Sequence, residues 1–124
     1  MFHKQSNNQI HQSAVDGTNL AEIIHPFHHP ADPKTSYSLS HVFLKSGKKS
    51  QSHRLLKSIE TYIIISGHGI ITVNNEEEVV SPGSVIVVPK NSAQHIRNSG
   101  KKTLEFYCIV SPPWQQDQDV LIEL

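Results

Sequence analysis

A histidine and a glutamate seven residues apart, His53 and Glu60, are the side chains in this sequence best suited to chemistry. An imidazole nitrogen and a carboxylate oxygen can bind a divalent transition metal, and the same groups can exchange protons with a substrate. His53 lies in the segment QSHRLL, and Glu60 begins the segment ETYIIIS, which ends before Gly67. The use of either group therefore depends on the elements that bring the two together.

Short apolar segments separated by turn sequences fill most of the chain. Runs such as VIVV alternate with turns such as SPGS and SGKK, at a spacing of roughly 8–10 residues. No segment keeps an apolar stripe of helical period for three turns. The pattern predicts an all-β protein, an antiparallel sandwich or barrel.

The chain is expected to form one domain, since 124 residues can bury a moderate core. We expect a polar N-terminal tail at 1–18, either mobile or ordered only by a neighbour, and the barrel at 19–113. The remaining residues, 114–124, form a C-terminal tail or edge strand. Within them, DVLIEL could also be a strand given to a second subunit, or a short helix.

Composition argues against several classes of function. Eleven basic and eleven acidic residues give a net charge of zero, whereas a nucleic-acid-binding surface normally carries a basic excess. The apolar runs are far shorter than the roughly 20 residues of a membrane span, and the N-terminus lacks the pattern of a secretory signal. Cys108, the only cysteine, fits a reducing interior. We expect a cytoplasmic protein with neither a nucleic-acid nor a membrane partner.

The spacing around His53 resembles the first motif of the cupin superfamily, Gly-x5-His-x-His-x3-4-Glu-x6-Gly. Gly47, His53, Glu60 and Gly67 take the corresponding positions. Leu55 stands where the second histidine of the motif is usual. The resemblance therefore keeps one histidine and the glutamate of this motif and loses one ligand.

The second cupin motif, Pro-x-Gly-x-x-His-x-x-x-Asn, resembles PKNSAQHIRN at residues 89–98, with Gln94 at the histidine position and Asn98 at its end. Strand alternation places Gln94 and His95 on opposite faces, and the unshifted match makes Gln94 the inward residue. The resemblance covers about residues 37–112. It implies a small cupin 2 type domain: a double-stranded β-helix, or jelly-roll β-barrel, also called RmlC-like.

In cupins, three histidines and a glutamate usually hold Fe, Mn, Ni, Cu or Zn at the barrel centre. The resemblance therefore implies a divalent transition metal on His53 and Glu60, with the amide oxygen of Gln94 as a weaker ligand. A third nitrogen could come from His41, which alternation places on an apolar strand face. A lone histidine on such a face is more often a hydrogen-bonded core residue, so this alternative stays open.

Enzymatic and non-catalytic functions are both compatible with this pattern. One is a metal-dependent dioxygenase, isomerase or lyase acting on a small carboxylate or sugar-like ligand. Without metal, Glu60 or His53 could act as an acid–base pair. The other is a non-catalytic module with a degenerate, metal-free pocket for a small molecule. In both cases we expect a homodimer, as is common for cupin barrels. The expected pocket residues are Tyr37, Phe43, Leu55, Tyr62, Ile96 and Phe106.

Overall fold

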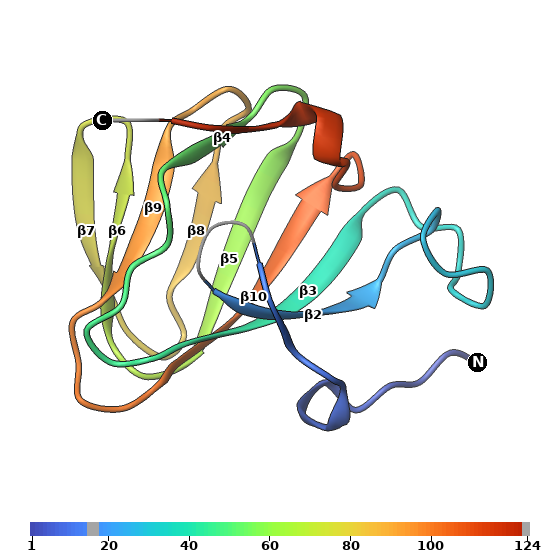
Figure 1. The fold of residues 1–124 in the computed structure, drawn as a ribbon, viewed down its shortest axis with the longest axis horizontal. Helices are drawn as coiled ribbons and strands as arrows, with labels where there is room; N and C mark the ends of the chain where they lie inside the picture. The colour runs from blue at the N-terminus through green and yellow to red at the C-terminus, as the bar shows by residue number, and fades with distance from the viewer. Residues whose placement is uncertain (15–17, 123–124) are drawn as a thin grey trace.

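Two antiparallel sheets face one another in the computed structural model, which describes residues 1–14 and 18–122 (Figure 1). The first sheet has the order β1 (Gln12–Ser13), β2 (Asn19–Ile24), β3 (Ser38–Leu44), β10 (Leu104–Ser111), β5 (Ile59–Ser66) and β8 (Val85–Val88). The second has the order β11 (Asp119–Leu121), β4 (His53–Leu55), β9 (Gln94–Asn98), β6 (Gly69–Val73) and β7 (Glu76–Val80). Two 3₁₀ turns, η1 (Ser6–Asn8) and η2 (Gln116–Gln118), complete the described elements. The predicted all-β jelly-roll barrel is confirmed.

Alternating burial along the central strands gives the two sheets one shared core. β10 buries Leu104 and Phe106, and β5 buries Tyr62 and Ile64. Successive strand residues point to opposite faces, so these side chains all enter the space between the sheets. The rings of Tyr62 and Phe106 pack with their centroids 5.5 Å apart. The same alternation carries Glu60, two residues before Tyr62, into the interior.

The turn after β5 requires a glycine at Gly67. Its φ is +88°, a backbone conformation that glycine adopts without steric cost. A Cβ atom at this position would lie 2.7 Å from the carbonyl oxygen of Thr103. The motif glycine therefore allows β5 to turn tightly against the start of β10.

Asn98, at the end of β9, holds the turn between β9 and β10 against β3. Its amide nitrogen donates to the carbonyl oxygens of Leu44, at 2.8 Å, and Lys102, at 2.9 Å. Its amide oxygen accepts the backbone N–H of Gly100 at 2.9 Å. The side chain is only 2% exposed. The asparagine of the second motif thus has a structural role in this chain.

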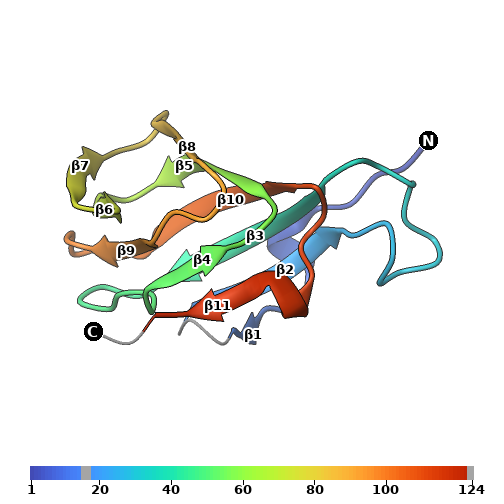
Figure 2. The same cartoon turned by 90° about the horizontal axis from the view of Figure 1, so that it is seen from above.

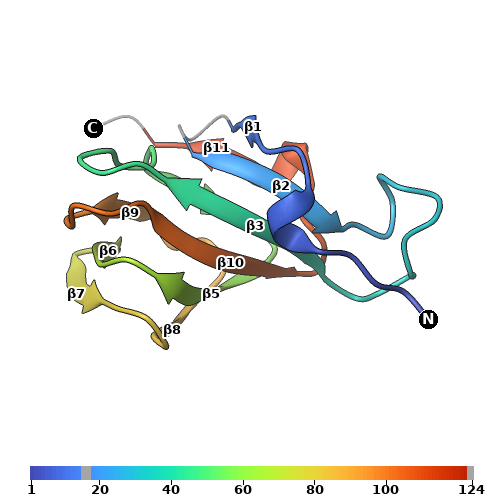
Figure 3. The same ribbon diagram turned by 90° about the horizontal axis from the view of Figure 1, so that it is seen from below.

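Both terminal segments belong to the barrel, on the same side of the molecule but in different sheets (Figures 2 and 3). β1 pairs with β2, and the hydroxyl groups of Ser6 and Tyr107 lie 2.6 Å apart. β11 pairs with β4, with Leu121 opposite His53. Within the predicted tails, residues 12–13 thus form β1 and residues 119–121 of DVLIEL form the edge strand β11, while 123–124 lie outside the described residues. In the described part of the chain, no helix is long and apolar enough to cross a membrane.

A buried carboxylate, Asp32, anchors the N-terminal segment and the loop after β2. It accepts the His25 backbone N–H at 2.8 Å and the Lys4 ammonium at 3.2 Å. Burial alone would raise the pKa of Asp32, but these two donors hold it below its ordinary value. A carboxyl group with a lowered folded-state pKa stabilises the fold above its unfolded-state pKa, about 3.9, and loses this contribution as pH falls through the folded-state value.

We therefore expect Asp32→Asn to lower the free energy of unfolding by about 1–2 kcal/mol at pH 7, where the charge-assisted hydrogen bonds are intact. In urea titrations at pH 7 and pH 3, the difference from wild type should shrink at the lower pH. The exposed Asp117→Asn is the matched control and should match wild type at pH 7. An Asp32→Asn difference that is equal at both pH values would contradict this role of the charge.

Candidate functional site

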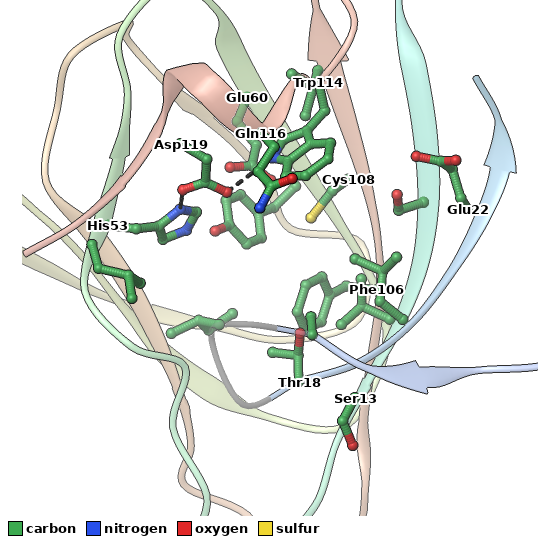
Figure 4. A pocket seen from close by; sticks show the side chains of 18 of the residues that line it. Ser13, Thr18, Glu22, His53, Glu60, Phe106, Cys108, Trp114, Gln116 and Asp119 are labelled. Atoms are coloured by element: carbon green, nitrogen blue, oxygen red, sulfur yellow. Dashed lines mark hydrogen bonds and ion pairs between the residues drawn. The ribbon is translucent and has the colours of Figure 1, made fainter. Parts of the chain in front are cut away.

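A cavity of about 630 Å³ lies between the two sheets and is closed on one side by both terminal segments (Figure 4). Four of its polar side chains, His53, Asp119, Glu60 and Gln116, lie close together at one end, while Ser13, Thr18 and Glu22 border it elsewhere. Apolar side chains such as Phe106 form most of the remaining wall. The lining residues are Ser13, Ala14, Thr18, Leu20, Glu22, Ser40, Val42, His53, Glu60, Tyr62, Ile96, Phe106, Cys108, Val110, Trp114, Gln116, Asp119, Val120 and Leu121.

His53 is oriented by a carboxylate from the C-terminal segment. Its Nδ1 lies 2.9 Å from Oδ1 of Asp119, and the other carboxylate oxygen accepts the indole N–H of Trp114 at 2.8 Å. A carboxylate acceptor fixes the proton of a neutral imidazole on Nδ1 and leaves Nε2 as the basic nitrogen. Nε2 is on the cavity side of the ring (Figure 4). The contact thus orients the His53 ring at the border of the cavity.

Asp119 is suited to this task because it stays ionised. Burial alone would raise the pKa of Asp119, but hydrogen bonds from His53 and Trp114, together with the charge of His53, hold it below its ordinary value. An ionised carboxylate also stabilises the imidazolium that forms when His53 takes up a proton. The pair therefore favours acid–base chemistry at the cavity.

Two further polar groups of β5 face the same space. Glu60 is 8% exposed and lies at the polar end of the cavity (Figure 4). Tyr62 is 3% exposed, and its hydroxyl group donates a short hydrogen bond to Oε1 of Gln94. The amide oxygen of Gln94, which was predicted as a metal ligand, therefore accepts the Tyr62 hydroxyl group instead.

The structure brings together five of the ten side chains predicted for the site. Those that line the cavity are His53, Glu60, Tyr62, Ile96 and Phe106. Gln94 and Leu55 point inward from their strands and are each 2% exposed, yet neither reaches the cavity. Gln94 is buried and His95 less so, as the unshifted match to the second motif requires.

The remaining three predicted residues need correction, beginning with His41. It is fully buried on the outer face of β3, beneath the N-terminal segment. Its Nδ1 lies 2.8 Å from Nε2 of His11, and its Nε2 lies 2.6 Å from the Glu105 carboxylate. His41 is therefore held by its neighbours outside the cavity, where it cannot bind a metal at the barrel centre.

Phe43 and Tyr37 are also outside the cavity. The ring of Phe43 packs against His11 on the outer face of β3, and Tyr37 precedes this strand without lining the cavity. Ser40 and Val42 supply the cavity face of β3 instead. Both faces of the strand carry apolar side chains because the N-terminal segment covers the outer one. The alternation of side chains along β3 therefore could not predict which of its two faces borders the cavity.

Comparison with known proteins agrees with this fold. A family model described as a cupin domain matches residues 40–110, which is more than half of the chain. The chain belongs to the cupin family. An uncharacterised protein of Methanocaldococcus jannaschii is 29% identical to this cupin over 108 residues, covering 87% of the chain and 84% of that protein.

Solved structures show the same barrel at low sequence identity. Pac13 of Streptomyces, a nucleoside dehydratase, has a TM-score of 0.78 and 18% identity, covering all of this cupin and 92% of that chain. A predicted oxalate decarboxylase of Thermotoga maritima has a TM-score of 0.76 and 18% identity, covering 90% of this cupin and 99% of that chain. At these identities the likeness shows the fold alone.

The donor set at the barrel centre of this cupin does not fit the metal that the family usually holds. Of the four predicted ligands, only His53 and Glu60 border the cavity, since Gln94 is bonded to Tyr62 and His41 lies outside. Across residues 1–14 and 18–122, the only group of three ligand-bearing side chains with donor atoms within 4.8 Å of one another combines Glu22 of β2 with His25 and His28 of the following loop. The predicted set is thus reduced to one imidazole and one carboxylate, which would hold a transition metal poorly, and both oxygens of the nearby Asp119 carboxylate are bonded to His53 and Trp114.

Sequence reasoning missed the residues that the terminal segments bring to the cavity. Asp119, Trp114 and Gln116 come from the C-terminal segment, and Ser13 and Thr18 from the N-terminal one. The sequence offered a weak signal for Asp119, an acidic residue at the start of a possible edge strand. Its partner His53 is 66 residues away, so only the pairing of β11 with β4 reveals the contact.

Proposed function

We propose that this cupin is a metal-independent acid–base enzyme, of the dehydratase or isomerase type, acting on a small hydroxylated carbonyl compound. The observation that carries the proposal is the Asp119 carboxylate bonded to His53 Nδ1 at the polar end of the cavity. This arrangement equips one imidazole to accept a proton and then return it.

In the proposed reaction, Nε2 of His53 takes the proton from a carbon next to a carbonyl group, and the electron pair of that C–H bond forms an enolate. For dehydration, the enolate expels the hydroxyl group on the neighbouring carbon, and His53 returns its proton so that water leaves. For isomerisation, the proton returns to a different atom of the enolate. Asp119 stabilises the intermediate imidazolium, and Glu60 accepts a hydrogen bond from a substrate hydroxyl group.

The cavity suits a ligand with one polar and one apolar side. Its polar end holds His53 and Glu60, while Val42, Phe106 and Val110 lie along the wall. A volume of about 630 Å³ lies in the usual range for small-molecule sites. The fold relative Pac13 is a nucleoside dehydratase, and its variants have been seen with uridine, which supports a ligand of up to nucleoside size in a barrel of this fold.

Proton exchange tests the proposal before the true substrate is known. The untagged protein would be incubated in D₂O with dihydroxyacetone, D-glyceraldehyde, D-galacturonate and 2-keto-D-gluconate, and ¹H NMR would follow the loss of each α-proton signal. We expect exchange faster than in buffer for at least one compound, in the presence of a chelator. No exchange with any of them would count against an enzymatic role.

A non-catalytic module is the second candidate, favoured by the largely apolar wall of the cavity. Such a module would bind a compound of this panel, or uridine, without exchanging its protons. Saturation-transfer NMR on the same samples separates the two functions, because it reports binding alone.

A further inference from the structure

The end of β2 and the loop after it carry a second group of ligating side chains, at the opposite border of the cavity from His53. Glu22 lies in β2, and His25 and His28 follow it in the segment HPFHHP. One ligand atom from each of the three lies within 4.8 Å of the other two. We propose that Glu22, His25 and His28 bind one transition-metal ion, with Zn²⁺ the best match, at this edge of the barrel. The proposal does not depend on the acid–base function.

His25 is positioned as metal-bound histidines usually are. Its ring is fully buried, and Nε2 donates to the backbone carbonyl oxygen of Trp114 at 2.6 Å. A histidine that binds a metal through one ring nitrogen commonly donates its other N–H to a backbone carbonyl group, which fixes the ring. Nδ1 is then the nitrogen that would bind the metal; it accepts the Phe27 backbone N–H at 3.2 Å, and a bound ion would displace this hydrogen bond.

The Glu22 carboxylate contacts both exposed histidines of the loop, His28 and His29. His28 Nδ1 lies 2.9 Å from one oxygen of the Glu22 carboxylate and 3.1 Å from the other, and His29 Nε2 lies 3.0 Å from the first. A register shift between Glu22 and Ile24, where β2 pairs with β3, interrupts the ladder at this carboxylate.

Only a small rearrangement separates the observed positions from a metal site. In a tetrahedral Zn²⁺ site the donor atoms lie about 3.4 Å apart, somewhat closer than the 4.8 Å limit of this cluster. The rings of His25 and His28 are stacked, with centroids 3.4 Å apart and planes within 2°. His28 must turn to aim a nitrogen at the shared ion, and its 40% exposed side chain leaves it room to do so.

The donor types select the metal. Two imidazole nitrogens and one carboxylate oxygen suit Zn²⁺, and Cu²⁺ or Ni²⁺ less specifically, whereas Mg²⁺ and Ca²⁺ prefer oxygen donors alone. A hollow of about 360 Å³, bordered by His25, His28 and Trp114, leaves room for a water molecule as the fourth ligand. His25 is bonded to the Trp114 carbonyl group, and the Trp114 indole is bonded to Asp119. An ion on His25 would therefore stabilise the contact between this loop and the segment that orients His53.

Zinc titration of the untagged full chain tests the proposal. Competition with a chromophoric chelator should show one Zn²⁺ bound per wild-type chain, and Co²⁺ should give the visible absorption of a tetrahedral site. Glu22→Gln and His28→Gln should each weaken Zn²⁺ binding by at least about tenfold. His68→Gln, on an exposed turn, is the matched control and should leave the affinity unchanged. His53→Gln should leave it unchanged as well, because His53 lies at the barrel centre.

Three results would overturn the site: no stoichiometric Zn²⁺ uptake by wild type, wild-type affinity in His28→Gln, or loss of binding in His53→Gln. The last would move the metal to the barrel centre and count against the metal-independent function at the same time.

Thermal unfolding gives a second readout of Zn²⁺ binding. Zn²⁺ should raise the melting temperature of wild type and His68→Gln but not that of His28→Gln.

Discussion

His53→Gln is expected to lose proton exchange by a factor on the order of 10²–10⁴, the usual contribution of a general acid–base residue. Glutamine has about the length of histidine but no basic nitrogen, so the cavity keeps its shape while the proton acceptor is gone. ¹H NMR exchange rates in D₂O measure the loss. Saturation-transfer NMR on the same variant should still show ligand binding, because the apolar wall at Phe106 is unchanged.

Asp119→Asn separates orientation from catalysis. The amide can still accept the Nδ1–H of His53, but it lacks the charge that stabilises the imidazolium. We expect an exchange rate between those of wild type and His53→Gln, with the loss in kcat rather than KM. His95→Gln is the control, since its ring lies on the other face of the sheet, 3.1 Å from the Ser52 hydroxyl group. Equal activity in His95→Gln and His53→Gln would contradict the assignment.

Asn98→Ala is expected to lower the free energy of unfolding by about 2–4 kcal/mol. The substitution removes three hydrogen bonds and leaves the carbonyl groups of Leu44 and Lys102 and the N–H of Gly100 to find other partners. Urea unfolding followed by circular dichroism measures the change. The m-value, the slope of the free energy of unfolding against urea concentration, should equal that of wild type if the barrel still unfolds in one step.

The exposed neighbour Ser99 supplies the control for this variant. Ser99→Ala should change stability by no more than about 0.5 kcal/mol, as for most exposed positions. Asn98→Asp should resemble Asn98→Ala, because it keeps an acceptor for Gly100 but loses both donors. A stable Asn98→Ala variant would mean that the turn between β9 and β10 does not depend on this side chain.

The barrel and part of its cavity lining could be predicted from local patterns. Strand alternation and the two motif spacings place Glu60, Tyr62, Ile96 and Phe106 in the interior, because each pattern depends only on neighbours in the chain. His53 follows from the first motif. These residues all lie on strands whose inner face is set by their own sequence.

The rest depends on contacts between segments far apart in the chain. β3 is apolar on both faces, so the side that receives His41 is decided by the N-terminal segment that covers it. Asp119 enters the site through the pairing of β11 with β4, across 66 residues of sequence. Because both contacts depend on residues distant in the chain, the predicted metal ligands differ from the observed His53–Asp119 pair.

Proton exchange by chelator-treated protein tests the central claim most directly. The sample should be the His28→Gln variant, which lacks the proposed zinc site at the edge of the barrel, and elemental analysis should confirm that it carries no transition metal. The account predicts that this protein exchanges the α-proton of a panel compound at the wild-type rate, and that adding His53→Gln removes the activity. Activity that vanishes on chelation and returns with Fe, Mn, Ni or Zn would contradict it.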